Sequence, residues 1–350
     1  MNNKDKKSNK ILWSLLFVLI AALTIWAVTS QSANFSVGDF FAFLKELDPL
    51  YTVLAFVAML FFVLFEGLAI MAIIRSFGYS RNAAKGISYS AADIYFSAIT
   101  PSASGGQPAS ALLMMHDGIP GAVVTVALLT NLIMYTFAII IIGIVSFLIH
   151  PTMFLNFSIV SRILIIVGCV LQVCIAVIFI LLLRKDKVLY KICSAVLTLF
   201  AKLRLVKNLE GKKEKLRVSI NEYQALVSEL KGKAPMLGRA LLYNVIQRVS
   251  LIFVTVFAFL ASGGSSELIS EIGVSQSMVV LGSNTVPIPG AMGVIDYLLV
   301  DAFGDYMDAS TAINLDLFSR AVSFYFCVLL CGLVFLARLI IMQIKKRKSK

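Results

Sequence analysis

The sequence predicts an all-α polytopic membrane protein with about six full spans and two re-entrant, broken-helix hairpins in an inverted repeat. Three observations predict this class. Of the 350 residues, 59% have apolar side chains, and the mean hydropathy is +0.90, a balance typical of polytopic membrane proteins. Six apolar segments are long enough to cross a bilayer. Two further segments are moderately apolar but interrupted by glycine and proline.

The six expected spans cover residues 11–28, 51–74, 121–149, 159–183, 238–262 and 317–342. Lysines and arginines precede the first span, follow the second and the fourth, and form the tail KKRKSK. If the spans alternate in direction, these cations share one side, which the positive-inside rule identifies as the cytoplasm. Both termini are therefore expected there. The opposite loops carry the acids Asp39, Glu46, Asp48, Glu267, Glu271, Asp305, Asp308 and Asp316.

The basic N-terminus and the apolar run from Ile11 are similar to a signal peptide. The run is long enough to span, however, and no small-residue cleavage site follows it, so we expect a retained first helix. The net charge of +12 lies mainly in segments that flank apolar runs, which indicates anionic lipid as the partner. No aromatic-basic groove pattern accompanies it, so nucleic-acid binding is not expected.

Two interrupted segments must enter the membrane and return to the side from which they came. Residues 87–119 follow a basic loop and contain TPSASGGQPASALLMMHDG, which breaks at Thr100 and predicts a second short helix from Pro108. Residues 273–303 lie between two acidic loops and contain NTVPIPGAMGVID. A broken helix is tolerated at membrane depth only where its loose backbone is buried in protein or lines a wet cavity.

The chain therefore reads as one membrane domain, 1–350, built of two matching halves. Residues 11–149 and 159–342 each contain spans and one hairpin in opposite orientation, with a basic, amphipathic cytoplasmic insert at 185–236. Paired glycine- and proline-interrupted segments at corresponding places are typical of inverted-repeat transporters with a site near the midplane. The alternative is two ordinary kinked helices and a different topology.

Polar groups of the hairpin tips and charges inside the spans are the candidate site. Ionisable side chains in a membrane are costly and mark functional sites; here they are Glu66, Asp93, Arg248 and Arg320. A structural ion pair of Arg248 with Glu66 or Asp296, joining the two halves, is as well supported as binding of a lipid head group by Arg248. Helix N-termini at the tips suit a phosphate. The tip residues are Ser102, Ser104, Gly105, Gly106, Gln107, Pro108, Asn284, Pro287, Pro289, Gly290, Gly293 and Asp296.

Signatures of enzymes are missing from the sequence. It contains no Walker loop, HExxH motif, GxSxG motif or histidine-rich cluster. The five cysteines lie in or beside apolar helices without histidine or acidic partners at metal-binding spacing. We therefore expect no catalytic residue, no metal and no cofactor in this chain.

Two motifs carry a family resemblance: PSASGGQPASALLMMHDGIP and, far downstream, PIPGAMGVID. In this order they resemble the transmembrane domain of bacterial lysylphosphatidylglycerol synthases (the multiple peptide resistance factor) and its stand-alone relatives, the flippase-like membrane proteins. The resemblance covers nearly the whole chain. It implies a place in the bacterial cell membrane and movement of aminoacylated phosphatidylglycerol from the inner to the outer leaflet, which protects against cationic antimicrobial peptides.

Three positions depart from the pattern of that family. Gln107 stands where an acid often follows the glycine pair, which puts a proton-coupled or cation-recognising role of the first tip in doubt. Asp296 stands where glutamate often closes the second motif and keeps the charge with a shorter reach. Ala291 replaces a second glycine.

Three functions are compatible with these observations. The first is a flippase for lysyl-phosphatidylglycerol or another polar lipid, with an anionic or aminoacylated phospholipid as partner. The second is the membrane module of a phosphatidylglycerol lysyltransferase whose soluble enzyme acts in trans; that enzymatic domain has no counterpart before KKRKSK, so no transferase activity is expected of this chain. The third is a transporter for a small solute or ion. The lipid, the energy source and assembly into a homo-oligomer stay open.

Overall fold

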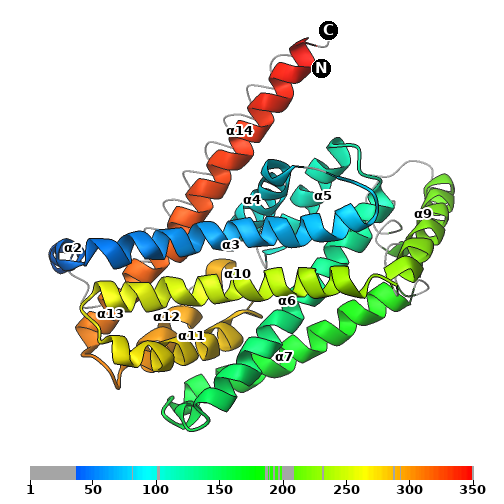
Figure 1. Cartoon of the computed structure of the whole chain (residues 1–350). Helices are drawn as coiled ribbons and strands as arrows, with labels where there is room; N and C mark the ends of the chain where they lie inside the picture. Colours follow the sequence, from blue (N-terminus) through cyan, green and yellow to red (C-terminus); the bar gives the residue numbers. More distant parts are fainter. Residues whose placement is uncertain are drawn as a thin grey trace.

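The computed structural model describes residues 37–348, except positions 81, 101–102, 186–187, 189, 192–193, 196–197, 199–208, 231, 287 and 292. Every regular element in this part of the chain is helical (Figure 1). The helices are α2 (Val37–Glu46), α3 (Pro49–Ser76), α4 (Ala83–Ile99), α5 (Gly106–His116), α6 (Gly121–Ile149), η2 (Met153–Leu155), α7 (Ile159–Arg184), α9 (Leu209–Leu230), α10 (Ala234–Ala261), η3 (Ser266–Leu268), α11 (Ile269–Ser283), η4 (Pro289–Ala291), α12 (Val294–Phe303), α13 (Ala309–Arg320), η5 (Ala321–Phe326) and α14 (Cys327–Lys348).

Five helical stretches among the described residues are long and apolar enough to cross a membrane. Four of them, formed by α3, α6, α7 and α10, lie within a few residues of the expected spans. The fifth, Ala309–Ile344, begins earlier than the expected 317 because α13, the π-helical turn η5 and α14 follow one another without a break. The expected first span, 11–28, lies outside the described residues.

Helices α3 and α10 form an antiparallel central pair. At one end the Asp48 backbone N–H donates to the Ala261 carbonyl over 2.8 Å, and at the other end Lys233 Nζ donates to the Ser76 carbonyl over 2.7 Å. Asp48 also caps α3, because its side chain accepts the backbone N–H of Leu50 at 2.7 Å. The remaining helices are arranged around this pair (Figure 1).

Two helix–break–helix hairpins begin at opposite ends of the central pair. The first hairpin, α4 and α5, follows the C-terminal end of α3, whereas the second, α11 and α12, follows the C-terminal end of α10 (Figure 1). In each hairpin the two helices pack against each other. The breaks at 100–105 and 284–293 fall where glycine and proline interrupt the sequence, as predicted. Helix α5 begins at Gly106, two residues before the expected Pro108.

The apolar core is divided into two clusters by a polar layer halfway along α3 and α10. One cluster takes Ala55 to Val63 from α3, and the other takes Ile70 to Ile74. Glu66 lies between them and is buried. Helix α10 repeats the pattern, with Asn244, Gln247 and Arg248 between its two apolar parts. A polar layer inside such apolar helices is costly, and it locates the candidate site.

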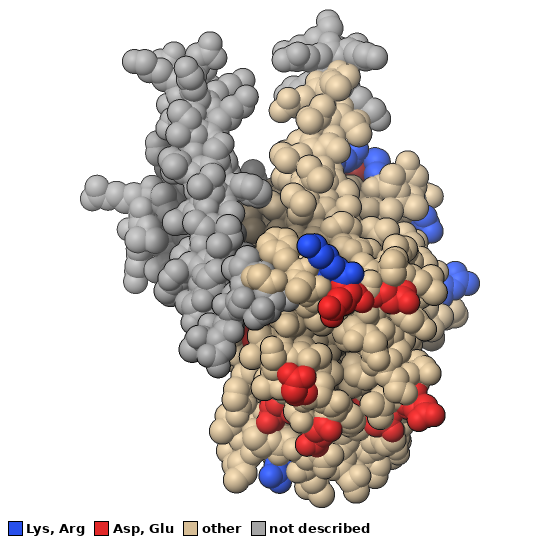
Figure 2. Space-filling model, turned by 90° about the vertical axis from the view of Figure 1, so that its left-hand side faces the viewer, with Lys and Arg blue, Asp and Glu red and all other residues tan. Residues whose placement is uncertain are grey.

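The end of the molecule where α3 begins and α10 ends carries exposed acids (Figure 2). Glu46, Asp48, Glu267 and Asp305, four of the acids that the sequence analysis assigned to the external loops, are exposed there. Asp316 was expected among them, and this was wrong, because it is buried within α13. The helix α9 lies at the other end and packs against α6.

Candidate functional site

A cavity of about 390 Å³ lies in the polar layer, between the tips of the two hairpins. Helices α3, α4, α5, α6 and α10 border it together with the turn η4 of the second hairpin and with η5 and α14. Gln107 of the first tip and Gly290 of the second tip both line this one space. Its other polar lining residues are Glu66, Asp93, Ser97, Asn131, Tyr135, Ser323, Asn244, Gln247 and Arg248.

The first tip is built by a close contact between α4 and the start of α5. Gly106 is buried, and a methyl group in its place would lie 2.1 Å from Asp93 Oδ1 and 2.1 Å from Ser97 Oγ. Only glycine allows this approach. The approach lets the Gln107 side-chain amide donate to the Asp93 carboxylate, while Ser97 Oγ donates to the same group over 3.2 Å.

Other predicted residues of this tip lie around the turn before α5. Ser104 and Pro108 are exposed and do not line the cavity. Gly105 donates its backbone N–H to Thr100 Oγ1 over 2.8 Å, which closes the turn. Ser102 lies outside the described residues.

Arg248 is buried in the cavity wall and forms no ion pair with any described acid. Its guanidinium stacks over the Tyr135 ring at 4.2 Å and the Phe62 ring at 5.1 Å, and the side chain is 9% exposed. Among the described residues no acid lies within ion-pair distance of Arg248, and its Nε has no hydrogen-bond partner. Arg248 therefore forms no ion pair with Glu66 or Asp296.

The two acids of the cavity are held by amides instead of by cations. Glu66 Oε2 accepts from Gln247 Nε2 over 2.9 Å, and Asp93 accepts from Gln107. Amide donors bind a carboxyl group without bringing a positive charge of their own. The wall of the cavity thus presents one arginine and two acidic side chains in the same space.

The second tip is fastened to three neighbouring helices. Asn284 Oδ1 accepts from the Tyr135 hydroxyl over 2.6 Å, and Asn284 Nδ2 donates to Gln172 Oε1 over 3.0 Å. Arg320 Nη1 donates to the Gly290 carbonyl over 2.9 Å. Tyr135 therefore contacts both Arg248 and the second tip.

The backbone of the second tip needs left-handed conformations. Gly290 has φ +62° and Gly293 has φ +79°, values that glycine adopts without strain. Ala291 has φ +49°, at the position where the resembled family often has glycine. Pro289 begins the turn η4, and Pro287 lies outside the described residues.

Asp296 and Arg320 pair with each other behind the second tip. Arg320 Nε lies 2.7 Å from Asp296 Oδ1, and Asp296 Oδ2 accepts the Gly293 backbone N–H over 2.8 Å. Neither side chain lines the cavity. Of the predicted charged residues, Glu66, Asp93 and Arg248 line the same cavity. Asp296 and Arg320 lie outside it and pair with each other behind the second tip.

Sequence reasoning missed Tyr135 and Asn131 of α6. Both line the cavity, and Asn131 Oδ1 accepts from Asn244 Nδ2 over 3.0 Å. Their signal was present in the sequence, because two polar groups four residues apart in an apolar span share one helix face.

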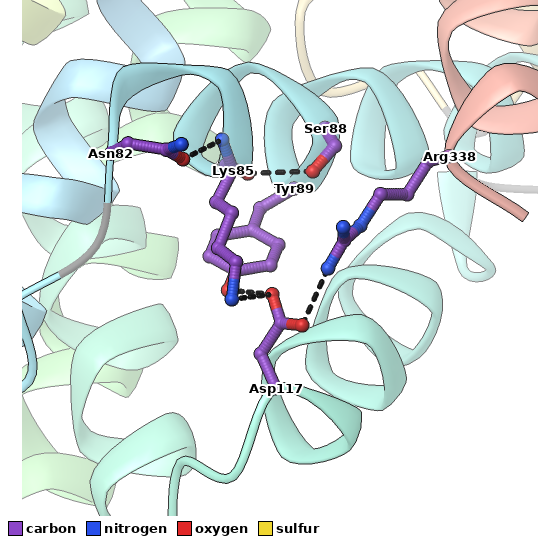
Figure 3. Close-up of polar contacts among 6 residues, drawn as sticks. All are labelled: Asn82, Lys85, Ser88, Tyr89, Asp117 and Arg338. Carbon is purple, nitrogen blue, oxygen red and sulfur yellow. Dashed lines mark hydrogen bonds and ion pairs between the residues drawn. The ribbon is translucent and has the colours of Figure 1, made fainter. Parts of the chain in front are cut away.

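A second charged cluster lies at the base of the first hairpin (Figure 3). Asp117 Oδ1 pairs with Arg338 Nη2 at 2.5 Å, and its Oδ2 lies 2.6 Å from the Tyr89 hydroxyl and 3.3 Å from Lys85 Nζ. Burial opposes ionisation of Asp117, but the Tyr89 hydroxyl and the Arg338 and Lys85 cations outweigh it and lower the pKa of this carboxyl. The cluster joins α4, the end of α5 and α14.

Comparison with known proteins identifies a family. No curated protein matches the chain. The family model described as "Lysylphosphatidylglycerol synthase TM region" matches residues 11–331, which include both hairpins and all residues of the cavity. The chain therefore belongs to the family of the lysylphosphatidylglycerol synthase transmembrane region.

Proposed function

We propose that this chain is a flippase-like lipid transporter that carries lysyl-phosphatidylglycerol, or a related polar lipid, from the inner to the outer leaflet of the bacterial plasma membrane. The main observation in support of this proposal is that two hairpins starting at opposite ends of the α3–α10 pair meet at one charged cavity. Both hairpins are then re-entrant elements, and the cavity lies near the bilayer midplane.

The charges of the cavity suit a head group with both signs of charge. Arg248 has no carboxylate partner among the described residues, so its guanidinium is available to a lipid phosphate. Glu66 and Asp93, held by neutral amides, suit the ammonium groups of an aminoacylated lipid. The side chain of Gln107 is neutral, and its amide orients the Asp93 carboxyl group.

The size of the cavity favours a head group over a whole lipid. Its volume of about 390 Å³ lies in the range of about 300–1,000 Å³ typical of small-molecule pockets. The acyl chains stay in the bilayer. Rocking of one half of the molecule against the other opens the cavity to each leaflet in turn, and release of the lysylated lipid outside lowers the negative charge that attracts cationic antimicrobial peptides.

The test is leaflet exchange of labelled lysyl-phosphatidylglycerol in reconstituted vesicles. We expect wild type to exchange lipid well above empty vesicles, and Arg248→Gln to reduce the rate about tenfold or more, the loss expected when a charge-assisted hydrogen bond worth about 1.5–3 kcal/mol is removed. Arg239→Gln is the matched control, since Arg239 is an exposed arginine of the same helix, α10. Exchange no faster than in empty vesicles contradicts the proposal, and equal rates for all three proteins contradict the role of Arg248.

The family match favours one second candidate, a membrane module that holds lipid for a lysyltransferase acting in trans. It predicts binding of lysyl-phosphatidylglycerol without leaflet exchange and co-purification of a soluble transferase. A solute transporter predicts neither lipid binding nor exchange, and uptake of a solute into the same vesicles identifies it.

A further inference from the structure

Asp316 is a buried carboxyl group with an oxygen that no described residue binds. It lies in α13, is 5% exposed, and its Oδ1 atom has no hydrogen-bond partner among the described residues. No cation of the described residues lies within ion-pair distance of it. An ionised carboxylate in such a place carries a large desolvation cost, which a bound proton removes.

The charges around Asp316 do not balance when every group is ionised. Arg320 lies one helical turn further along α13 and is already paired with Asp296 at 2.7 Å. Two carboxylates and one guanidinium leave a net charge of −1 in the interior. When Asp316 holds a proton, the group is neutral, and Arg320 is free to grip Asp296 and the Gly290 carbonyl.

Among the described residues, α13 and the elements packed against it bring only Asp296 and Arg320 as charged groups to Asp316. Asp296 of α12 and Arg320 of α13 itself are the ionised groups that act on Asp316, and the Tyr325 phenol of η5 lies near the same charges. Helix α10 contributes Thr255, a neutral hydroxyl 2.8 Å from Ser319 Oγ. In α2, Lys45 and Glu46 are exposed.

A proton fits this site better than a metal ion. Calcium and magnesium ions need several oxygen ligands, whereas no group of three or more His, Cys, Asp and Glu suited to a metal occurs among the described residues. Asp296 Oδ2 is already occupied by the Gly293 backbone N–H. A single proton on Asp316 requires no further ligand.

We propose that Asp316 is the proton-binding group that couples proton movement to release of the second hairpin tip. When the proton leaves, the O–H bond of Asp316 breaks and the proton passes to water. The carboxylate then attracts Arg320, its neighbour one turn away on α13. Arg320 gives up the Gly290 carbonyl and Asp296, whose side chain is 18% exposed and better solvated than Asp316. No other bond changes.

The position of Arg320 suits this exchange of partners. It is the last residue of α13, directly before the π-helical turn Ala321–Phe326, and such turns are frequent at functional sites. Gly290, which Arg320 releases, lines the head-group cavity. Protonation of Asp316 therefore decides whether the second tip is fixed. The effect of Asp316 on lipid exchange rests on the proposed function, whereas proton binding by Asp316 does not.

The experiment compares wild type, Asp316→Asn and Asp305→Asn in the vesicle assay from about pH 5 to about pH 9, a range that brackets carboxyl groups held in protein interiors. Asparagine mimics the protonated acid, so Asp316→Asn keeps Arg320 on the hairpin at every pH. Asp305 is an exposed acid and serves as control. A rate governed by one protonation changes by up to about tenfold per pH unit.

We expect the exchange rate of wild type and Asp305→Asn to rise with pH, and that of Asp316→Asn to be low and independent of pH. Infrared spectra of the same proteins detect the protonated carboxyl group directly and do not depend on transport. We expect a protonated-carboxyl band that is present at neutral pH in wild type to be absent in Asp316→Asn. If no protein exchanges lipid but this band difference is found, the flippase proposal fails and the proton site stands. An unchanged pH profile or an unchanged band in Asp316→Asn overturns the inference.

Discussion

Gly106 shows how one small residue shapes the candidate site. Its missing side chain allows the start of α5 to touch α4 at Asp93 and Ser97. This contact places Gln107 against the Asp93 carboxylate and points both groups into the cavity. A side chain at 106 separates the two helices, because interiors packed this closely do not absorb an added methyl group without strain.

We therefore expect Gly106→Ala to lower the free energy of unfolding by about 1–3 kcal/mol, as overpacking of a close helix contact does, and to slow lipid exchange. Gly121→Ala is the matched control, because the nearest atom to its added methyl group, Met115 Sδ, is 3.6 Å away. Thermal unfolding in detergent measures both variants. Equal stability of Gly106→Ala and wild type would show that the contact is looser than described.

Buried charges at the residue scale divide into those that hold the fold and those available to a ligand. Arg320 is neutralised by Asp296 at 2.7 Å. Arg248 instead rests on the Tyr135 ring at 4.2 Å, a contact that stabilises a cation by about 0.5–2 kcal/mol without cancelling its charge. The two arginines are equally buried, so burial alone does not separate these roles.

At the scale of elements, the two hairpins are anchored in different ways. The second is held at its tip, where Arg320 of α13 donates to the Gly290 carbonyl and Asn284 donates to Gln172 of α7. The first is held at its base, where Asp117 joins the end of α5 to the start of α4 and to α14 (Figure 3). Because α14 also packs along α4, the Asp117 cluster fixes the angle of the first hairpin against the last span.

The Asp117 cluster predicts a pH-dependent stability. The pKa of Asp117 is lowered in the folded protein, so its contribution is fully present above the ordinary carboxyl range near about pH 4 and is lost as the pH falls through the lower folded value. We expect Asp117→Asn to be less stable than wild type by about 2 kcal/mol at neutral pH, the scale of a hydrogen bond to a charged group.

Thermal unfolding of the two proteins between neutral and strongly acidic pH checks this, with Asp305→Asn as the exposed control. The gap between Asp117→Asn and wild type should close in acid. A gap that stays constant with pH would show that Asp117 acts without its charge.

On the scale of the whole molecule, the antiparallel α3–α10 pair gives the protein two chemically different ends. Acids such as Glu46, Glu267 and Asp305 are exposed at one end (Figure 2), and Lys85 and Lys233 lie at the other. Both hairpins start from this pair, one at each end. The same pairing thus separates the charges for membrane orientation and brings both tips to the middle.

Orientation can be measured by labelling single introduced cysteines in intact cells. We expect a membrane-impermeant maleimide to label Asp305→Cys in intact cells and Glu229→Cys only after permeabilisation, because both positions are exposed but lie at opposite ends. Wild type controls for the native cysteines. The reverse pattern would place the acidic end in the cytoplasm.

The sequence by itself determined the helical membrane class, the positions of four of the five long apolar helical stretches that the structure describes, and the two breaks. These features are local: an apolar run must form a helix to satisfy its backbone in lipid, and glycine and proline interrupt it wherever they stand. It also identified Glu66, Asp93 and Arg248 as functional candidates, since a charge within an apolar run is visible without any contact.

Only the tertiary structure decided which of these groups meet. Asp296 pairs with Arg320 and not with Arg248, Asp316 is buried in place of lying in an external loop, and Tyr135 enters the cavity wall. Such contacts join residues far apart in the chain, as in the Tyr135–Asn284 bond with its separation of 149 and the Glu66–Gln247 bond with its separation of 181. The antiparallel packing of α3 and α10 determines which of these residues meet. The pattern within one helix shows which face is polar but not which helix that face will contact.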